Sequence, residues 1–193
     1  VGEVSRCAPA GHGDALLSQR PAGRFFAGGD VSRLTGFPPI LDAGVETLVL
    51  GSFPSPDSLA RQAYYARPQN QFWRIMAALT GEPLVDMPYA GKTAALLRHH
   101  IGVWDVYRHC RREGALDSAI EAAEPNDFSS LASQAPQLKR VCFNGRTAAK
   151  FERHFASRGY ATHVLPSTSP AYAAMNFEGK LAAWQRAFTS GAI

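Results

Sequence analysis

The sequence has few cysteines and no long apolar run, and these absences exclude several common classes of protein. Cys7, Cys110 and Cys142 are too few and too scattered for a disulfide framework or a zinc site. No stretch is apolar enough to span a bilayer, and residues 1–30 lack the ordered regions of a secretory signal. We therefore expect reduced thiols, a cytoplasmic compartment and no association with a membrane.

Common catalytic signatures are also missing. Six histidines are present, but none of them forms an H-x-x-x-H or H-E-x-x-H pair, so we expect no metal site. The sequence contains no G-x-x-x-x-G-K-[ST] phosphate loop and no G-x-S-x-G nucleophile elbow. These absences argue against a metalloenzyme, a P-loop nucleotidase and an α/β-hydrolase.

The composition is that of a globular protein. The 193 residues are 46% hydrophobic and 19% charged, which suits one domain with a substantial core. The net charge of +4 favours an anionic partner such as nucleic acid. Residues 1–30 are rich in Gly, Ala, Arg and Ser without periodicity, which predicts a flexible arm. Residues 31–193 are then the single folded domain.

Short apolar runs alternate with helical patterns along the rest of the chain. Strands are expected at 46–52, 101–107 and 139–145, and a fourth begins at residue 160. Helices are expected at 71–81, 92–100, 127–134 (capped by Asp127), 146–159 and 176–190. This alternation predicts an α/β sandwich with a mostly parallel sheet. Ligands of such sheets bind at the carboxyl ends of the strands, so the loops there are candidate sites.

The first of these loops follows the strand at 46–52. Gly51 permits a sharp exit from the strand, and Tyr65 offers a flat ring on which a heterocycle can stack. Asn70 has a donor and an acceptor that could bind a base edge or hold a water, although Asn is also common at helix starts. Phe72 and Trp73 have the spacing of a helix face and are expected in the core.

Two further segments carry candidate side chains. A rigid hydroxyl-rich loop suits phosphate binding and could insert into a base stack, although it also fits an ordinary turn. Its residues are Ser167, Thr168, Ser169, Pro170, Ala171 and Tyr172. Asp105 ends an apolar strand, where a carboxylate needs a partner. It could bind a base, orient a water or pair with Arg108 or Arg111.

The order of two motifs resembles the uracil-DNA glycosylase superfamily. The motifs are "GSFPS" followed by "YYARPQNQFW" near the front, and "LPSTSPAYA" near the end. The resemblance is strongest to the hypoxanthine-DNA glycosylase branch (family 6) and covers residues 36–188. It implies a three-layer α/β/α sandwich with a central four-stranded, mostly parallel sheet. It also implies a monomeric, cofactor-free enzyme that flips a deaminated base out of DNA and hydrolyses its glycosidic bond.

The resemblance assigns roles to individual residues. Phe53 stands where many members carry an Asp or Asn that activates water, so the catalytic role passes to Asn70. Tyr65 corresponds to the stacking ring, Ser52 and Phe53 line the base pocket, and Asp105 occupies a base-reading position. The 167–172 loop is expected on the DNA strand, with Ser167 where many members have His or Asn.

Two other functions remain open from the sequence. A domain of this fold could bind nucleic acid or lesions without catalysis, since Phe53 cannot activate water. A small-molecule hydrolase could use Ser52 or Ser167 as a nucleophile with a histidine base, although no motif supports that pairing.

Overall fold

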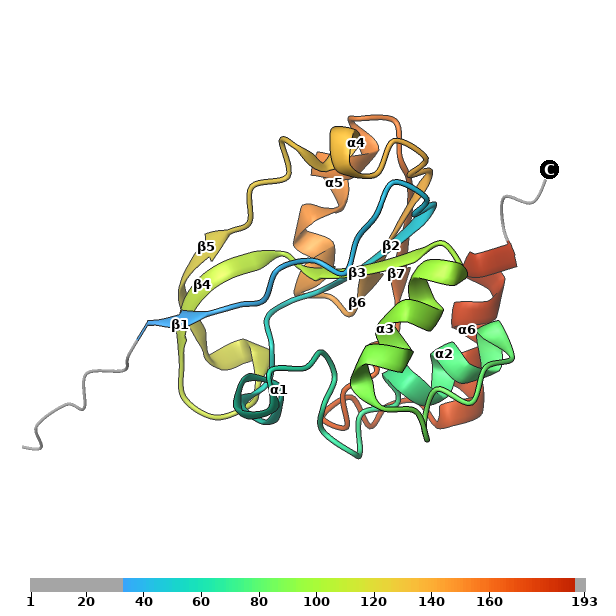
Figure 1. The fold of residues 1–193 in the computed structure, drawn as a ribbon. Coiled ribbons are helices and arrows are strands. Elements are labelled where there is room, and N and C mark those ends of the chain that lie inside the picture. The colour runs from blue at the N-terminus through green and yellow to red at the C-terminus, as the bar shows by residue number, and fades with distance from the viewer. Residues whose placement is uncertain (1–32, 190–193) are drawn as a thin grey trace, which may run out of the picture. The chain divides into compact units, whose positions relative to one another are not determined.

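The structure is a computed structural model that describes residues 33–189. The predicted arm at residues 1–30 lies outside the described residues. The rest of the chain forms a central parallel sheet with helices on both faces and a smaller antiparallel sheet beside it (Figure 1). No helix among residues 33–189 is long and apolar enough to cross a membrane.

The central sheet has four parallel strands. They are β2 (Thr47–Gly51), β3 (Ile101–Asp105), β6 (Arg140–Asn144) and β7 (Ala161–Leu165). Their spatial order is β3-β2-β6-β7. Within this sheet the first strand along the chain is β2, β3 pairs with one side of it, and β6 and then β7 are added on the other side. The four-stranded parallel sheet expected from the sequence is therefore confirmed.

The sheet separates two apolar layers because strand side chains alternate between its faces. Val49 and Cys142 belong to the core beneath α2 (Phe72–Thr80), α3 (Tyr89–Arg98) and α6 (Phe177–Thr189). Leu48, Leu50 and Val141 belong to the core on the other face. That face is covered by α4 (Leu131–Gln134), η2 (Ala148–Phe151) and α5 (Glu152–Ala156). The three-layer α/β/α sandwich is thus present, and Phe72 and Trp73 lie in its core as expected.

The strand predicted at 101–107 is wrong in its extent, because two strands share that segment. β3 ends at Asp105, and β4 (Tyr107–Arg112) pairs antiparallel with β1 (Leu34–Thr35) and β5 (Ile120–Pro125). The sequence reasoning missed this second sheet because β4 is rich in Arg and His instead of apolar residues. A short 3₁₀ helix, η1 (Asp117–Ala119), precedes β5.

Several helix boundaries also differ from the expectation. The 127–134 helix is only α4, its cap position is Ser130, and the Asp127 carboxylate instead accepts the Ser129 N–H in a turn at 2.8 Å. The 146–159 helix is divided into η2 and α5. A helix that the sequence reasoning missed, α1 (Pro56–Arg61), lies inside the first loop, where the Ser55 hydroxyl caps it by accepting the Ser58 N–H.

Candidate active site

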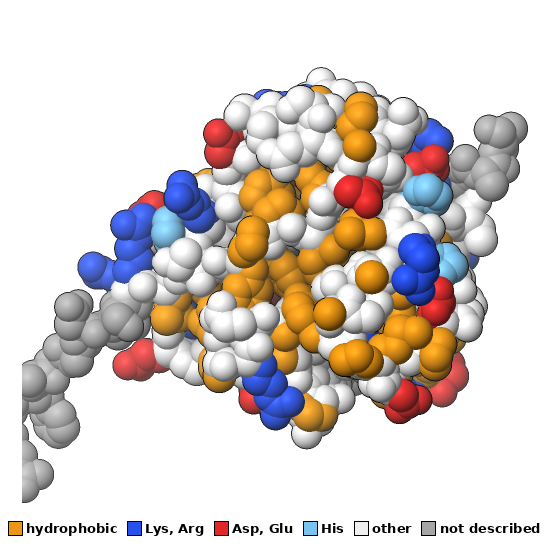
Figure 2. All heavy atoms as spheres, in the orientation of Figure 1, with side chains coloured by type: hydrophobic (Ala, Val, Ile, Leu, Met, Phe, Trp, Pro, Cys, Tyr) orange, Lys and Arg blue, Asp and Glu red, His pale blue; other side chains and the backbone are white. Residues whose placement is uncertain are grey.

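A cavity of about 800 Å³ opens at the carboxyl ends of the central strands. Its walls come from the segments after β2, β6 and β7, from the last residue of β3, and from the end of β4 with the turn that follows it. Figure 2 shows this face of the molecule hollowed near its centre, with apolar side chains gathered around the hollow. The location is the one that open parallel sheets use for ligands.

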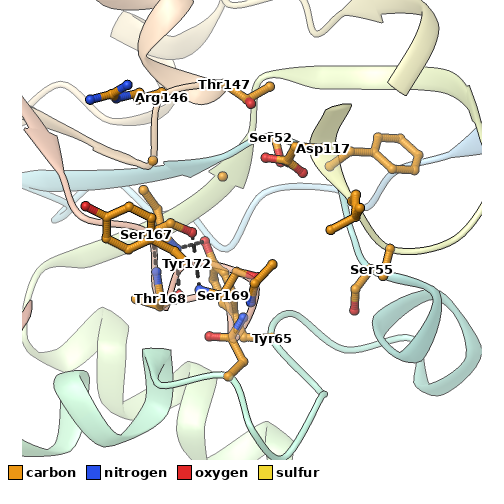
Figure 3. A pocket seen from close by; sticks show the side chains of 18 of the residues that line it. Ser52, Ser55, Tyr65, Asp117, Arg146, Thr147, Ser167, Thr168, Ser169 and Tyr172 are labelled. Carbon is orange, nitrogen blue, oxygen red and sulfur yellow. Dashed lines mark hydrogen bonds between the residues drawn. The ribbon is translucent and has the colours of Figure 1, made fainter. Parts of the chain in front are cut away.

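The structure brings nearly all the sequence-predicted site residues to this one cavity. The residues from the prediction that line it are Gly51, Ser52, Phe53, Tyr65, Asn70, Asp105, Ser167, Thr168, Ser169, Ala171 and Tyr172. Pro170 is the one predicted residue that is not part of the lining. Figure 3 shows Ser52 and Asp117 across the pocket from Ser167 and Thr168.

Asp105 is the most buried acidic group of the cavity. Its side chain is 3% exposed, and its Oδ2 atom has no hydrogen-bond partner among the described residues. Burial, together with the negative charge of Asp117, raises the pKa of Asp105 to about 8, although the Arg112 cation opposes the shift. The carboxyl group forms no ion pair with Arg108 or Arg111 in the described chain. An unpartnered buried carboxyl group is costly, which is typical of a functional site.

Gly51 makes the position of Asp105 possible. The two residues are partners in the β2–β3 register. A methyl group on Gly51 would overlap the Asp105 carboxyl oxygen and lie 3.0 Å from the Tyr65 hydroxyl. Glycine is therefore required here for the close approach of these groups, in addition to the sharp exit expected from the sequence.

Asn144 is a site residue that the sequence reasoning missed. It ends β6, is 8% exposed and lines the cavity. Its Oδ1 accepts the backbone N–H of Thr168 at 2.9 Å, and its Nδ2 donates to the hydroxyls of Thr168 (2.9 Å) and Tyr65 (3.2 Å). The signal was available, because a polar residue ends an apolar strand here just as Asp105 does.

Tyr65 is held in a restrained conformation. Its backbone has a φ of 54°, in the left-handed region, and its ring stacks on Phe72 with centroids 3.9 Å apart. Burial and the nearby Asp105 carboxyl group raise the pKa of the Tyr65 hydroxyl, so it remains protonated throughout the neutral range. Phe72 covers one face of the ring, which leaves at most one face for a stacked base.

Asn70 combines a structural contact with a place in the cavity wall. Its Oδ1 accepts the Phe72 N–H at 3.0 Å, close to the start of α2. The helix-start role considered from the sequence therefore accounts for the amide oxygen of Asn70 but not for its amide nitrogen. Among the described residues no protein group accepts from its Nδ2, and this donor is available to a ligand. The next residue, Gln71, donates its N–H to the Thr168 carbonyl at 3.0 Å and joins the first loop to the last.

The turn between β4 and β5 supplies a wall that the sequence did not reveal. The Ser52 hydroxyl donates to the Asp117 carboxylate at 2.8 Å, which ties the exit of β2 to this turn. The Arg112 guanidinium donates to the Pro54 carbonyl and lies 5.4 Å from the centre of the Phe53 ring. Ser52 and Phe53 are both buried by these contacts.

The 167–172 loop is stabilised by its own hydroxyls and by a buried lysine. The Ser167 and Ser169 hydroxyls accept the N–H groups of Ser169 and Ala171, both at 3.2 Å. Lys180 is 2% exposed and donates to the Tyr172 carbonyl at 2.8 Å. The loop is therefore a rigid element that presents short polar side chains to the cavity.

The described residues do not form the alternative hydrolase or metal sites. No histidine lines the cavity, and neither Ser52 nor Ser167 hydrogen-bonds a histidine in the part of the chain that the structure describes. Residues 33–189 contain no group of three His, Cys, Asp or Glu side chains placed to hold a metal ion. Within residues 33–189 the geometry therefore offers neither serine the histidine base that this alternative requires.

Comparisons with known proteins agree with this geometry. The family model of the uracil DNA glycosylase superfamily matches residues 38–190. A protein of Methanosarcina acetivorans named hypoxanthine DNA glycosylase is 47% identical over 136 residues, which are 70% of this chain and 86% of the relative. A protein of the same name from Methanosarcina barkeri is 39% identical over 153 residues, covering 79% of this chain and 96% of that one.

A solved structure shares the fold. It is a solution NMR structure from Methanosarcina acetivorans named as a candidate uracil DNA glycosylase, and it is similar with a TM-score of 0.74 and 42% identity. The match covers 81% of this chain and 97% of that one. The chain belongs to the uracil DNA glycosylase superfamily and is a monofunctional DNA glycosylase, a hydrolase of N-glycosyl bonds.

Proposed function

We propose that this enzyme flips a deaminated base out of DNA and removes it by hydrolysis, leaving an abasic site. Hypoxanthine is the expected base, because two relatives carry that name, and uracil and xanthine are further candidates. The observation that carries the proposal is the Asp105 carboxyl group, which is buried in the wall of a cavity of about 800 Å³ and whose Oδ2 has no hydrogen-bond partner among the described residues. A cavity of this size is within the range of small-molecule sites.

Extrusion of the base follows from the depth of the site. A base inside a duplex cannot reach a carboxyl group that is 3% exposed, so the nucleotide has to leave the stack. Unpairing costs least at mismatched or damaged bases, which contributes to selection of the lesion. The rigid 167–172 loop and Arg146, which Figure 3 places at the rim above the pocket, would hold the DNA backbone.

The hydrolysis requires a positioned water and a stabilised leaving base. Deamination adds a carbonyl that can hold negative charge as the base departs, and hydrogen-bond donors aimed at that oxygen lower the barrier. The Asn70 amide is assigned to the water or to the leaving base, because Asn70 lines the cavity and its Nδ2 has no protein acceptor among the described residues. Phe53 is buried and apolar, so it shapes the pocket and leaves water placement to Asn70 and backbone groups.

The test is excision from labelled DNA that contains a single hypoxanthine, uracil or xanthine, paired or single-stranded. Alkali cleaves the strand at an abasic site, so a cleaved product identifies both the reaction and the base. Binding without cleavage at any lesion would instead support a lesion-binding domain. We also propose that the protein acts as a monomer, which gel filtration with light scattering tests directly.

A further inference from the structure

The orientation of the Asn144 amide is fixed by its neighbours. The Thr168 backbone N–H can only donate, so the atom 2.9 Å from it must be the Asn144 oxygen. The amide nitrogen then faces the two hydroxyls and donates to both of them. Asn144 and Thr168 are 8% and 0% exposed, so no solvent competes strongly for these bonds.

This orientation determines what the Tyr65 hydroxyl can do. Its oxygen accepts from Asn144, so its own proton has to point elsewhere. The hydroxyl borders the space beside Gly51, where it lies 3.0 Å from the position of a missing Cβ atom. The Asp105 carboxyl oxygen borders the same point from the other strand. The Tyr65 hydroxyl, which can donate, and an Asp105 carboxyl oxygen, which can accept, therefore both border this part of the cavity wall.

We propose that Asn144 is a positioning residue that presents the Tyr65 O–H as a donor to the base carbonyl, beside Asp105 as the acceptor of the adjacent base N–H. This inference rests on the proposed function and specifies its substrate class: a base with a C=O next to a ring N–H. Tyr65 then acts through its hydroxyl, which is a different role from the stacking expected of its ring.

The pairing explains discrimination by deamination. Hypoxanthine, uracil and xanthine each carry a carbonyl beside a ring N–H. Adenine and cytosine carry an amino group where the deaminated bases carry the carbonyl, which places donor against donor at the Tyr65 hydroxyl. A site that hydrogen-bonds its substrate rejects an analogue that leaves buried groups unpaired. Guanine and thymine share the recognised edge, so their exclusion has to come from other groups or from the cost of extruding a paired base.

The test compares Tyr65→Phe with the unaltered enzyme. Phenylalanine keeps the ring against Phe72 and removes only the hydroxyl. We expect single-turnover excision of hypoxanthine to fall about 10- to 100-fold. Binding to DNA with a non-cleavable 2′-fluorinated nucleotide should weaken for hypoxanthine and remain unchanged for purine, which lacks the 6-oxygen. Tyr160→Phe, outside the cavity lining, is the matched control and should change neither value.

The role of Asn144 is tested by a double-mutant cycle. Asn144→Ala should reduce the preference for hypoxanthine over purine, and it should have little further effect on that preference when Tyr65 is already Phe. A merely structural role would weaken binding of both bases equally. Thermal unfolding reports whether Asn144→Ala folds, and Tyr65→Phe decides the inference by itself if it does not.

The outcomes separate this inference from the proposed function. Full excision and an unchanged preference in Tyr65→Phe would overturn the inference while leaving the proposed function intact. Failure of the unaltered enzyme to excise any deaminated base would overturn the proposed function itself.

Discussion

Gly51 and Asp105 end two paired strands so close together that even a methyl group on Gly51 would overlap the Asp105 carboxyl oxygen. The carboxyl group is therefore pressed against the backbone of β2, buried from solvent and directed to the floor of the cavity. A main-chain contact between strands fixes the placement of the group to which we assign recognition of the base.

Gly51→Ala should damage both the site and the fold. The added methyl group would displace Asp105 and Tyr65, and overpacking of this kind costs about 1–3 kcal/mol in unfolding free energy. The excision rate should fall by a larger factor than the loss of unfolding free energy alone would cause, because the displaced groups are the ones assigned to the base. Gly91→Ala is the control, since a methyl group there meets only ordinary contacts in α3. It should leave excision unchanged and should not lower the unfolding free energy, because alanine is the better helix former. Equal behaviour of the two variants in unfolding and excision assays would contradict the role of Gly51.

Asn70→Ala should lose most of the excision rate while duplex binding is retained. Positioned help of this kind contributes about 10²- to 10⁴-fold in rate. The variant also loses one bond to the Phe72 N–H, so its melting temperature should be measured alongside. Gln69→Ala, exposed in the same loop, should keep full activity. If Asn70→Ala retains the full single-turnover rate, its catalytic assignment is wrong.

Asp105→Asn should change how stability depends on pH. The pKa of Asp105 is about 8 in the folded protein against an ordinary value of 3.8. Between these values the folded protein keeps a proton that the unfolded chain has released, so unfolding free energy falls as pH rises, by about 1.4 kcal/mol per pH unit. The fall ends above about pH 8. Asparagine does not titrate, so the unfolding free energy of the variant should not show this fall with pH.

Denaturant unfolding of both proteins at intervals from pH 5 to pH 9 measures this effect. The stability of Asp105→Asn relative to the unaltered protein should rise with pH up to about 8 and then become constant. A difference that is the same at every pH would show that Asp105 titrates normally and is not desolvated.

Arg146→Ala should weaken DNA binding whatever base the DNA contains. The residue is exposed at the cavity rim, where a phosphate contact is expected (Figure 3). The slope of log affinity against log salt should decrease by about 1. Arg98→Ala is the control, because Arg98 ends α3 just before β3 begins, at the opposite end of the strands from the cavity, and pairs with Glu82. A similar change of slope in both variants would remove Arg146 from the DNA interface.

The sequence predicted the central sheet well because buried parallel strands are continuous apolar runs. Consecutive apolar residues such as Val49 and Leu50 predict a strand that is buried on both faces of the sheet. Asp105 was found because a carboxylate at the end of such a run is unusual. Asn144 stands in an equivalent place and was missed, because it lies within the strand expected at 139–145 and was given no role beyond that strand.

The second sheet and its wall of the cavity could not be predicted in the same way. β4 alternates between buried residues such as Cys110 and exposed ones such as Arg111, and its polar residues concealed the strand. The contact of Ser52 with Asp117 spans 65 residues, and only the folded chain brings these side chains together. Local patterns determine elements, whereas the walls of a site depend on contacts between distant segments.

The measurement that tests the account most directly is single-turnover excision from DNA with one hypoxanthine, compared with otherwise identical DNA with adenine at the same position. The account predicts rapid cleavage after alkali for hypoxanthine, none for adenine, and loss of most of the hypoxanthine rate in Asn70→Ala. Folded enzyme that binds both DNAs and cleaves neither would contradict the account.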